Sequence, residues 1–336
     1  MSQTGGRNSR ILSVARHVPD LVVTNNDLAG RMETSDQWIQ QRTGIKQRHF
    51  SGDDVGAADL GAIAATEALQ RAGVRTEQIG LVIFCTLSPD YDMPSSACVL
   101  QARMGMSGMP AFDVRNQCSG FIYGLATADA YIKNGTCDYV LLVGGEIHST
   151  GIELTTRGRE VGVIFGDGAG ALVIGPSDDR TRGILSTHLH ADGKYAEMLW
   201  LESPGSRERP RLTEEMITNA RIFPKMKGRE VFRHAVTRFP EVIREALDTN
   251  GLTVADIDLL IPHQANQRIS QMVTMGLELP EGKLFTNIER YGNTTAASIP
   301  IALSEALEAG RVRDGSLLCL AAFGAGFTWA SALIRW

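Results

Sequence analysis

"EALQRAGVRTEQIGLVIFCT" occupies residues 67–86 of the 336-residue chain, and "EALDTNGLTVADIDLLIPHQ" occupies residues 245–264. The two stretches align without gaps and share seven identical residues, among them the glycine and three apolar residues of the run that follows it. Each stretch predicts an amphipathic helix, a stop at the glycine, a short turn and then an apolar strand. The repeat therefore indicates that the chain consists of two related halves.

A second pair of segments extends this repeat. "NQCSGFIYGLATADAYIKNG", before the apolar run 139–143, corresponds to "RYGNTTAASIPIALSEALEAG", before the apolar run 317–321. Alternating helices and apolar strands favour parallel sheets that carry helices on both faces. We therefore predict an α/β protein with a duplicated five-layer αβαβα body, in which residues 1–175 form the N-terminal half and residues 176–336 the C-terminal half.

Composition and charge narrow the partners that the protein could have. An apolar fraction of 43% is ordinary for a folded chain, and the net charge of −5 is spread along the sequence. No basic stripe favours nucleic acid, and no polybasic segment favours a membrane surface. The apolar runs are too short to span a bilayer, and the opening MSQTGGRNSR lacks the apolar core of a secretory signal. We expect a cytoplasmic protein with small-molecule or protein partners, and neither nucleic acid nor membrane among them.

The cysteine pattern argues against a disulfide framework and against a zinc site. The five cysteines are odd in number and lack the C-x-x-C spacing. His188 and His190 lie two positions apart, which puts them on one face of a strand, where they could supply half of a metal site. Because the sequence places no further ligand beside them, we expect no bound metal.

Cys118 lies where a loop enters a predicted helix, in DVRNQCSGFIYG (residues 113–124). Backbone N–H groups and the positive end of the helix dipole favour the thiolate there, which is the nucleophilic form at neutral pH. A free cysteine is also among the residue types most often buried as packing, so the position alone leaves both interpretations open. The partners of Cys118 have to decide between them.

Two further residues converge on the same region. His263 follows an apolar strand that ends at Pro262, and Asn293 takes the place of Cys118 in the second copy of the repeat. Ligands of such sheets bind beyond the carboxyl ends of the strands, which is where we expect all three side chains to lie. A lone His or Asn is usually structural, but the combination around one centre points to catalysis.

Three other segments carry possible binding features. FGAGFTWAS (323–331) follows a predicted strand, and its glycines let backbone N–H groups approach a reacting atom as an oxyanion hole requires, although a plain turn has the same composition. FGDGAG (165–170) precedes a strand and does not open a helix, so we interpret it as a turn and not as a phosphate loop. Trp38 and Arg42 lie one helical turn apart and form either a packed surface pair or a platform for a flat heterocycle.

These motifs together resemble the β-ketoacyl-acyl carrier protein synthase III family of the thiolase superfamily. TSDQWI, CSGF, FGDGAGA, THLHADG, PHQANQRI, YGNTTAASIP and FGAGFTW match family motifs in the same order over nearly the whole chain. The resemblance implies the duplicated five-layer fold and a decarboxylative Claisen condensation of an acyl-coenzyme A starter with a malonyl thioester, with malonyl-acyl carrier protein as the expected donor. It also implies a cytoplasmic homodimer that takes coenzyme A thioesters as substrates and holds no permanently bound cofactor.

The resemblance assigns roles to the three central residues. Cys118 would take the acyl group from the acyl-coenzyme A, and His263 and Asn293 would donate hydrogen bonds to the malonyl carbonyl as enolate charge develops. The backbone N–H groups of Cys118 and Ala325 would form a second oxyanion hole.

Coenzyme A contacts are implied in the same way. Trp38 and Arg157 match the pair that sandwiches the adenine, with Arg42 and Asn266 as further contacts. Arg157 lies in the segment TRGRE.

The acyl pocket and the carrier-protein surface complete the implied site. Phe323 would pack near the cysteine, and Met93 would reach across the dimer to line the acyl pocket. The basic residues expected to dock a carrier protein are Arg229, Arg233 and Arg268.

Several alternatives stay open at this point. The run 115–117 (RNQ) before the cysteine is similar to side-branch members of secondary metabolism, so neither the starter acyl group nor the pathway is named. An acyltransferase that passes the acyl group to an oxygen or nitrogen nucleophile is the alternative within the superfamily, and Asn293 favours condensation over it. A papain-like hydrolase also uses Cys, His and Asn in this chain order, but the local cysteine signature of that family is absent. A non-catalytic binding module would not need Cys118, His263 and Asn293 together.

Overall fold

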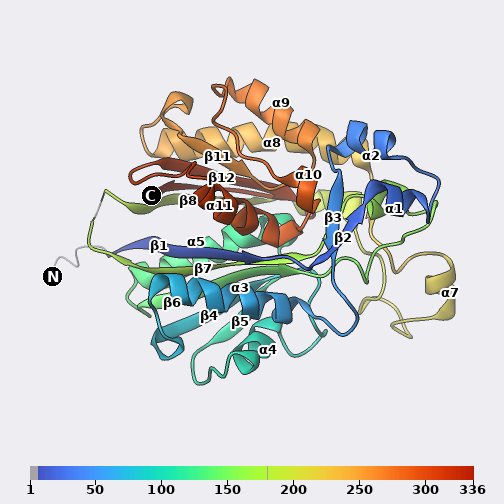
Figure 1. Ribbon diagram of the computed structural model, residues 1–336, viewed down its shortest axis with the longest axis horizontal. Helices are drawn as coiled ribbons and strands as arrows, with labels where there is room; N and C mark the ends of the chain where they lie inside the picture. The colour runs from blue at the N-terminus through green and yellow to red at the C-terminus, as the bar shows by residue number, and fades with distance from the viewer. Residues whose placement is uncertain (1–6, 180) are drawn as a thin grey trace.

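Two β-sheets lie face to face across a central layer of helices in the computed structural model of the protein, which describes residues 7–179 and 181–336 (Figure 1). The first sheet, in order, contains β1 (Asn8–His17), β7 (Gly168–Ser177), β6 (Tyr139–Glu146), β4 (Ile79–Cys85) and β5 (Ala111–Val114). The second contains β8 (Gly183–Ala191), β13 (Thr328–Arg335), β12 (Leu317–Gly324) and β11 (Leu259–Pro262). Apart from β5, the two sheets repeat one strand order, so the duplication inferred from the sequence is present in the topology.

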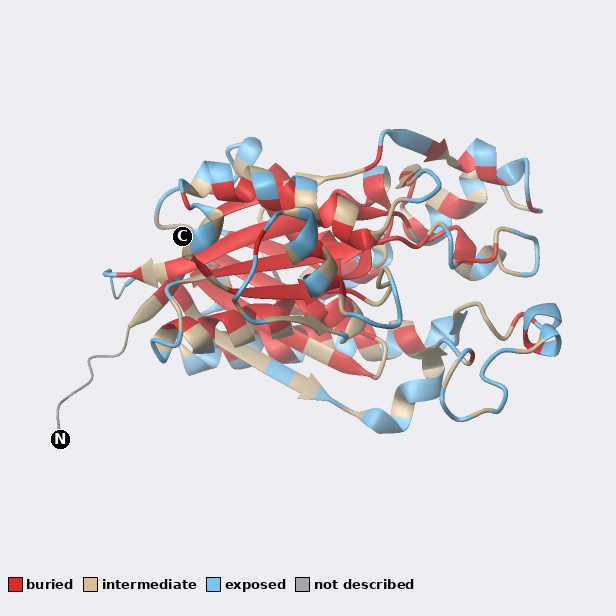
Figure 2. Cartoon of the chain, turned by 90° about the horizontal axis from the view of Figure 1, so that it is seen from below, coloured by how far each residue is buried: buried red, intermediate tan, exposed pale blue. Residues whose placement is uncertain are grey.

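The helices form three layers around the sheets. α5 (Gly120–Lys133) and α11 (Ser298–Glu308) lie between the sheets, and their apolar side chains join those of both inner sheet faces in one cluster. The outer face of the first sheet is covered by α3 (Ala57–Ala72) and α4 (Ser96–Arg103), and that of the second by α8 (Gly228–Thr249) and α9 (Gln267–Leu277). Figure 2 shows buried residues concentrated in the sheets and in the helices between them. The predicted five-layer αβαβα fold is confirmed.

Both sheets are mixed, which corrects the prediction of parallel sheets. β4 pairs in parallel with β5 and β6, and β11 pairs in parallel with β12, as expected for strands joined through helices. β13 pairs antiparallel with β12 because only residues 325–327 join them. The pairs β1–β7, β6–β7 and β8–β13 are antiparallel as well. The alternation of helix and strand in the sequence therefore predicts the direction only of those strands that follow a crossover helix.

Shorter elements gather at one end of the layered body, where Figure 1 shows α1, α2, β2, β3, α7 and α10. The short helices and strands are β2 (Leu21–Thr24), α1 (Asn25–Ala29), α2 (Asp36–Thr43), β3 (Gln47–Phe50), α6 (Arg159–Gly162), β9 (Leu199–Trp200), α7 (Glu214–Thr218), β10 (Lys225–Met226) and α10 (Ile288–Tyr291). The 3-10 helices are η1 (Thr76–Gln78), η2 (Gln117–Ser119), η3 (Gly193–Met198), η4 (Val254–Asp256) and η5 (Thr295–Ala297).

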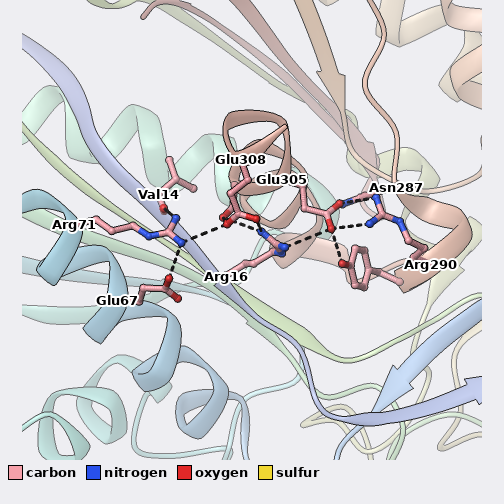
Figure 3. Close-up of polar contacts among 10 residues, drawn as sticks. Val14, Arg16, Glu67, Arg71, Asn287, Arg290, Glu305 and Glu308 are labelled. Carbon is pink, nitrogen blue, oxygen red and sulfur yellow. Dashed lines mark hydrogen bonds and ion pairs between the residues drawn. The ribbon is translucent and has the colours of Figure 1, made fainter. Parts of the chain in front are cut away.

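A carboxylate on the central helix α11 anchors the segment that leads to Asn293. Glu305 accepts hydrogen bonds from the Arg290 guanidinium at 2.8 and 2.9 Å and from the Tyr291 hydroxyl at 2.5 Å (Figure 3). In this charge-assisted network Glu305 and Tyr291 are buried and Arg290 is half exposed, and the bonds hold α10 against α11. The polar network continues through Asn287, Arg16, Glu308, Arg71 and Glu67, and thereby reaches β1 and α3 of the first half.

Three further features of the fold bear on the sequence predictions. Within residues 7–179 and 181–336, no helix is long and apolar enough to cross a membrane. Residues 1–6, part of the opening that we interpreted as lacking a secretory signal, lie outside the described residues. The chain leaves the first sheet at Ser177 and enters the second at Gly183.

Candidate active site

A cavity of about 430 Å³ is lined by Cys118, His263 and Asn293 together. Cys118 lies at the entrance to α5, Asn293 lies shortly before α11, and His263 follows β11 directly. The duplicated fold thus brings three residues from distant parts of the sequence to one place. A second cavity, of about 350 Å³, adjoins the first, since Leu87 and His148 line both.

A tight backbone turn presents the Cys118 side chain to the cavity. Gln117 adopts a φ of 45°, and Cys118 follows inside η2, immediately before α5 begins. A Cβ atom at Gly324 would lie 2.9 Å from the Cys118 sulfur, so glycine is what allows β12 to end this close to the thiol. The backbone N–H groups of Ala325 and of Cys118 itself hydrogen-bond the sulfur. Both donors therefore surround the atom at which an acyl group would be attached.

The resting state of Cys118 differs from the thiolate expected from its position. Burial, together with the charge of Glu146, raises the pKa of Cys118 to about 12, although the two backbone N–H groups act to lower it. Cys118 is only 7% exposed. The cost of removing a thiolate from water is larger than the stabilisation that the helix entrance provides, so the side chain is a thiol at neutral pH.

Glu146, the last residue of β6, is the charge that acts on this thiol. The carboxylate is fully buried and accepts hydrogen bonds from the Ser88 hydroxyl at 2.5 Å, the Thr86 hydroxyl at 3.1 Å and the backbone N–H of Leu87 at 3.1 Å. Burial raises the pKa of Glu146 to about 7 even though these donors lower it. Glu146 therefore changes its charge near neutral pH beside the candidate nucleophile.

His263 is neutral and turns one ring nitrogen toward the cavity. Its backbone N–H donates to the carbonyl of Ala321 at 2.8 Å, which holds the residue against the neighbouring strand β12. The Nδ1 atom lies 2.7 Å from the Ser298 hydroxyl, whereas the buried Nε2 atom has no hydrogen-bond partner among the described residues. Burial, with a smaller contribution from His148, lowers the pKa of His263 to about 3. Nε2 is thus the nitrogen available to a substrate.

Asn293 is held in one orientation by its own loop. Its backbone N–H donates to the Ile164 carbonyl at 2.9 Å, and its carbonyl accepts from Gly166 at 3.2 Å. The segment FGDGAG does not open a helix, as predicted, but it is not a separate turn: residues 168–170 already belong to β7, and Phe165 and Gly166 contact Asn293. The side-chain oxygen Oδ1 accepts from the backbone N–H of Thr295 at 2.8 Å. Because Oδ1 is occupied in this way, the amide nitrogen Nδ2 is the atom that Asn293 offers as a donor.

Trp38 carries two arginines on its ring. The guanidinium carbon of Arg42 lies 4.4 Å and that of Arg159 lies 5.3 Å from the ring centroid. Arg157, which the resemblance pairs with Trp38, instead donates to Glu153 at 2.7 Å and to a backbone carbonyl of α7. Among the described residues, the cations over this ring are therefore Arg42 and Arg159. The cluster presents an aromatic face and planar guanidinium groups, which suit a heterocycle.

The other implied contacts divide between the cavity and the surface. Asn266 lines the cavity, caps α9 and donates from Nδ2 to the Arg42 carbonyl at 2.9 Å. Phe323 of β12 also lines the cavity and is buried. Met93, in contrast, is 85% exposed and lines neither of the two cavities.

The arginines expected at a docking surface are exposed. Arg233 pairs with Glu230 at 2.5 Å, and the guanidinium carbon of Arg268 lies 5.6 Å from the ring centroid of Phe232. Phe232 lines the cavity, so Arg268 lies beside its wall. Arg229 follows the first residue of α8.

The pair His188 and His190 faces a carboxylate. His188 Nδ1 lies 3.3 Å and His190 Nε2 lies 2.6 Å from the two oxygens of Glu245. In the described part of the chain, no group of three or more His, Cys, Asp or Glu residues is placed to hold a metal ion.

Sequence reasoning missed five residues that support the site: Glu146, His148, Arg159, Thr295 and Ser298. Glu146 and His148 come at the carboxyl end of the apolar strand 139–143, as His263 does for its own strand, so a signal was available. Thr295 and Ser298 lie in the same small-residue run as Asn293, but nothing in that run indicates which side chains point inward.

Known proteins similar to this chain match it over almost its entire length. Two family models, "3-Oxoacyl-[acyl-carrier-protein (ACP)] synthase III" and its C-terminal counterpart, match residues 112–193 and 247–336. A curated β-ketoacyl-[acyl-carrier-protein] synthase III of Xanthomonas campestris is 44% identical over 331 residues, which cover 98% of each chain.

Solved structures show the same likeness. The crystal structure of 3-oxoacyl-[acyl-carrier-protein] synthase III from Aquifex aeolicus superposes with a TM-score of 0.90 at 40% identity, covering 98% of this chain and 100% of that one. A priming β-ketosynthase of the R1128 polyketide pathway superposes with a TM-score of 0.90 at 31% identity, covering 100% of this chain and 98% of that one. By sequence and by fold, the chain belongs to the β-ketoacyl-[acyl-carrier-protein] synthase III family.

Proposed function

We propose that the protein condenses an acyl-coenzyme A starter with malonyl-acyl carrier protein and releases carbon dioxide, giving a β-ketoacyl product in fatty acid or related biosynthesis. The observation that carries the proposal is the single cavity lined by Cys118, His263 and Asn293, with two backbone N–H groups on the sulfur. Residues 1–175 supply the nucleophile, and residues 176–336 supply the histidine and the asparagine.

In the first half-reaction, the Cys118 sulfur attacks the thioester carbonyl of the acyl-coenzyme A. Because the thiol has a raised pKa, its proton has to leave as the carbon–sulfur bond forms. The neutral His263 imidazole, with Nε2 facing the cavity, is placed to accept that proton and to return it to the departing coenzyme A thiolate. The products are acyl-Cys118 and coenzyme A.

In the second half-reaction, a malonyl thioester loses carbon dioxide and leaves an enolate. Asn293 Nδ2 and His263 Nε2–H donate to the thioester oxygen as its negative charge develops. The enolate carbon attacks acyl-Cys118, the backbone N–H groups of Cys118 and Ala325 bind the new oxyanion, and the sulfur leaves. One proton from solvent restores the Cys118 thiol, which balances the reaction.

The Ser298 hydroxyl explains how one histidine serves both steps. It lies 2.7 Å from His263 Nδ1 and 2.9 Å from the Thr295 carbonyl, and it has a single hydrogen to donate. When that hydrogen points to the carbonyl, Nδ1 carries the ring proton and Nε2 is a base. When it points to Nδ1, Nε2 carries the proton and is a donor.

The remaining assignments complete the proposal. Trp38 and Arg157 are proposed to hold the adenine of coenzyme A, with Arg42 and Arg159 beside the Trp38 ring, and Asn266 and Phe323 line the way to the thiol. The homodimer, with Met93 as a contribution to its partner's acyl pocket, the docking of a carrier protein on the exposed arginines and the cytoplasmic location belong to the same proposal.

Intact-protein mass spectrometry tests the function directly. The protein is incubated with a panel of acyl-coenzyme A esters and then with malonyl-coenzyme A or malonyl-acyl carrier protein. We expect an acyl adduct that is lost as a β-keto product and carbon dioxide appear. The adduct should be absent in Cys118→Ser and retained in Cys98→Ser, which changes an exposed thiol outside the site. An adduct that leaves only for an alcohol or an amine would identify an acyltransferase, and no adduct from any ester would refute the assignment.

A further inference from the structure

Thr295 has a backbone conformation that its residue type disfavours. It is β-branched and fully buried in η5, yet its φ is 45°, in the left-handed region. A β-branched residue with this φ is a genuine outlier, and such outliers persist only where the surrounding contacts hold them in place. The contacts of Thr295 therefore show what the conformation serves.

Each polar group of Thr295 reaches the support of a reacting residue. Its N–H donates to Asn293 Oδ1 at 2.8 Å, and its carbonyl accepts from Ser298, which in turn contacts His263. Its hydroxyl lies 2.8 Å from His148 Nε2. Of these contacts, the one to His148 is the only one that comes from the first half of the chain, and it holds the Thr295 side chain.

His148 is itself rigidly placed. It follows β6, and its backbone N–H donates to the fully buried Asp167 carboxylate at 2.7 Å. Its ring packs on Phe165 with the centroids 4.6 Å apart, and Phe165 forms a β-bridge with Asn293. His148 thus contacts two residues that hold Asn293: it hydrogen-bonds the Thr295 hydroxyl and packs on the Phe165 ring.

We infer that His148 is a positioning residue for decarboxylation, because it holds Thr295 in the conformation that keeps the Asn293 amide nitrogen turned toward the malonyl carbonyl. The inference rests on the proposed function. If the contact is lost, Thr295 relaxes from its unfavourable φ and its N–H leaves Asn293 Oδ1. The amide of Asn293 then rotates freely and offers its oxygen as often as its nitrogen to the developing enolate, which stabilises the transition state less.

The two half-reactions separate this role from a general effect on the fold. Acyl loading uses Cys118, with His263 as its base, and does not require the Asn293 donor, whereas decarboxylation requires both His263 and Asn293. His148→Leu removes the ring nitrogen, and Thr295→Val removes the hydroxyl while keeping the branched shape. His148→Gln and Thr295→Ser keep a hydrogen-bonding group at the same place and serve as matched controls.

The experiment measures acyl loading by intact mass and release of carbon dioxide from malonyl-acyl carrier protein for all four variants. We expect His148→Leu and Thr295→Val to slow carbon dioxide release at least ~10-fold. Acyl loading should slow clearly less, because it uses His263 but not the Asn293 donor, and His148→Gln and Thr295→Ser should stay close to wild type in both. The double variant His148→Leu/Thr295→Val should be no slower than the slower single variant, because the two changes remove one contact.

The outcomes that overturn the inference are distinct. Unchanged carbon dioxide release in both single variants, multiplicative effects in the double variant, or a parallel fall in loading and release would each overturn it while leaving the condensing function in place. A wild-type protein that loads an acyl group and releases no carbon dioxide would overturn the condensing function and the inference together.

Discussion

Gly324→Ala tests whether the close approach of β12 to Cys118 serves the reaction. A Cβ atom at position 324 would lie 2.6 Å from the Cys118 Cβ, 2.9 Å from its sulfur and 3.2 Å from its backbone nitrogen. Ordinary contacts between such atoms are ~3.5–4.0 Å. The end of β12 or the Cys118 segment must therefore move by about 1 Å, and neither is free to move, because Gly324 and Cys118 are buried.

The displacement acts on the oxyanion hole, because residue 325 follows directly. A shift of this size carries the Ala325 N–H away from the sulfur, where it now donates. Loss of one donor of an oxyanion hole costs about 10²–10³ in rate, or ~3–4 kcal/mol of transition-state stabilisation. Overpacking of a well-packed core costs a further ~1–3 kcal/mol of folding free energy. We expect acyl loading of Cys118 to fall by about 10² and the unfolding temperature to fall by a few degrees.

The loading rate is measured by quenching the reaction at successive times and determining the acylated fraction by intact-protein mass spectrometry. Thermal unfolding measures the stability. Gly52→Ala is the matched control, because a Cβ at position 52 would meet nothing within 4 Å. It should load at the wild-type rate. If Gly324→Ala loads within about 2-fold of wild type, the Ala325 N–H does not stabilise the oxyanion that forms during loading, and the reasoning is refuted.

Three further predictions concern titration and coenzyme A binding. Burial raises the pKa of Cys118 to about 12, so iodoacetamide at pH 8 should modify Cys118 at least ~10²-fold more slowly than the exposed Cys98. Peptide mapping measures both rates, and faster modification of Cys118 would mean that it rests as a thiolate. The folded state raises the pKa of Glu146 from 4.5 to about 7, so folding favours the protonated carboxyl and wild type loses stability as pH rises through that range. Relative to Glu146→Gln, the loss should approach ~3 kcal/mol between pH 4.5 and 8, and denaturation curves whose difference stays constant with pH would contradict it. Trp38→Ala should weaken coenzyme A binding about tenfold in calorimetry, because it removes the ring that Arg42 and Arg159 cover; an unchanged affinity would return Trp38 to ordinary packing.

Much of the architecture follows from local patterns in the sequence. The repeat at 67–86 and 245–264 carries the helix and strand periodicities of two related units, and two such units can bury their apolar faces only by stacking in layers. The same repeat predicts that Cys118 and Asn293 occupy equivalent helix entrances, which is where the structure has them. Periodicity, glycine stops and motif order are properties of neighbouring residues, so the chain itself displays them.

The direction of the strands and the state of the thiol are decided only by the folded molecule. The short turn at 325–327 makes β13 antiparallel to β12, and the motif alone does not distinguish that turn from a crossover. The helix entrance favours a thiolate at Cys118, but the depth of burial and the charge of Glu146, which the tertiary fold supplies, reverse the direction of its pKa shift.

The supports of the site depend on tertiary structure for the same reason. Arg159 lies over the Trp38 ring, a contact that no motif indicates, and His148 reaches Thr295 across 147 positions of sequence. The sequence by itself determines which segments form helices and strands and which residues are candidates for the chemistry. Only the tertiary structure decides their protonation, orientation and partners, because burial and hydrogen bonding depend on residues that come together only when the chain has folded.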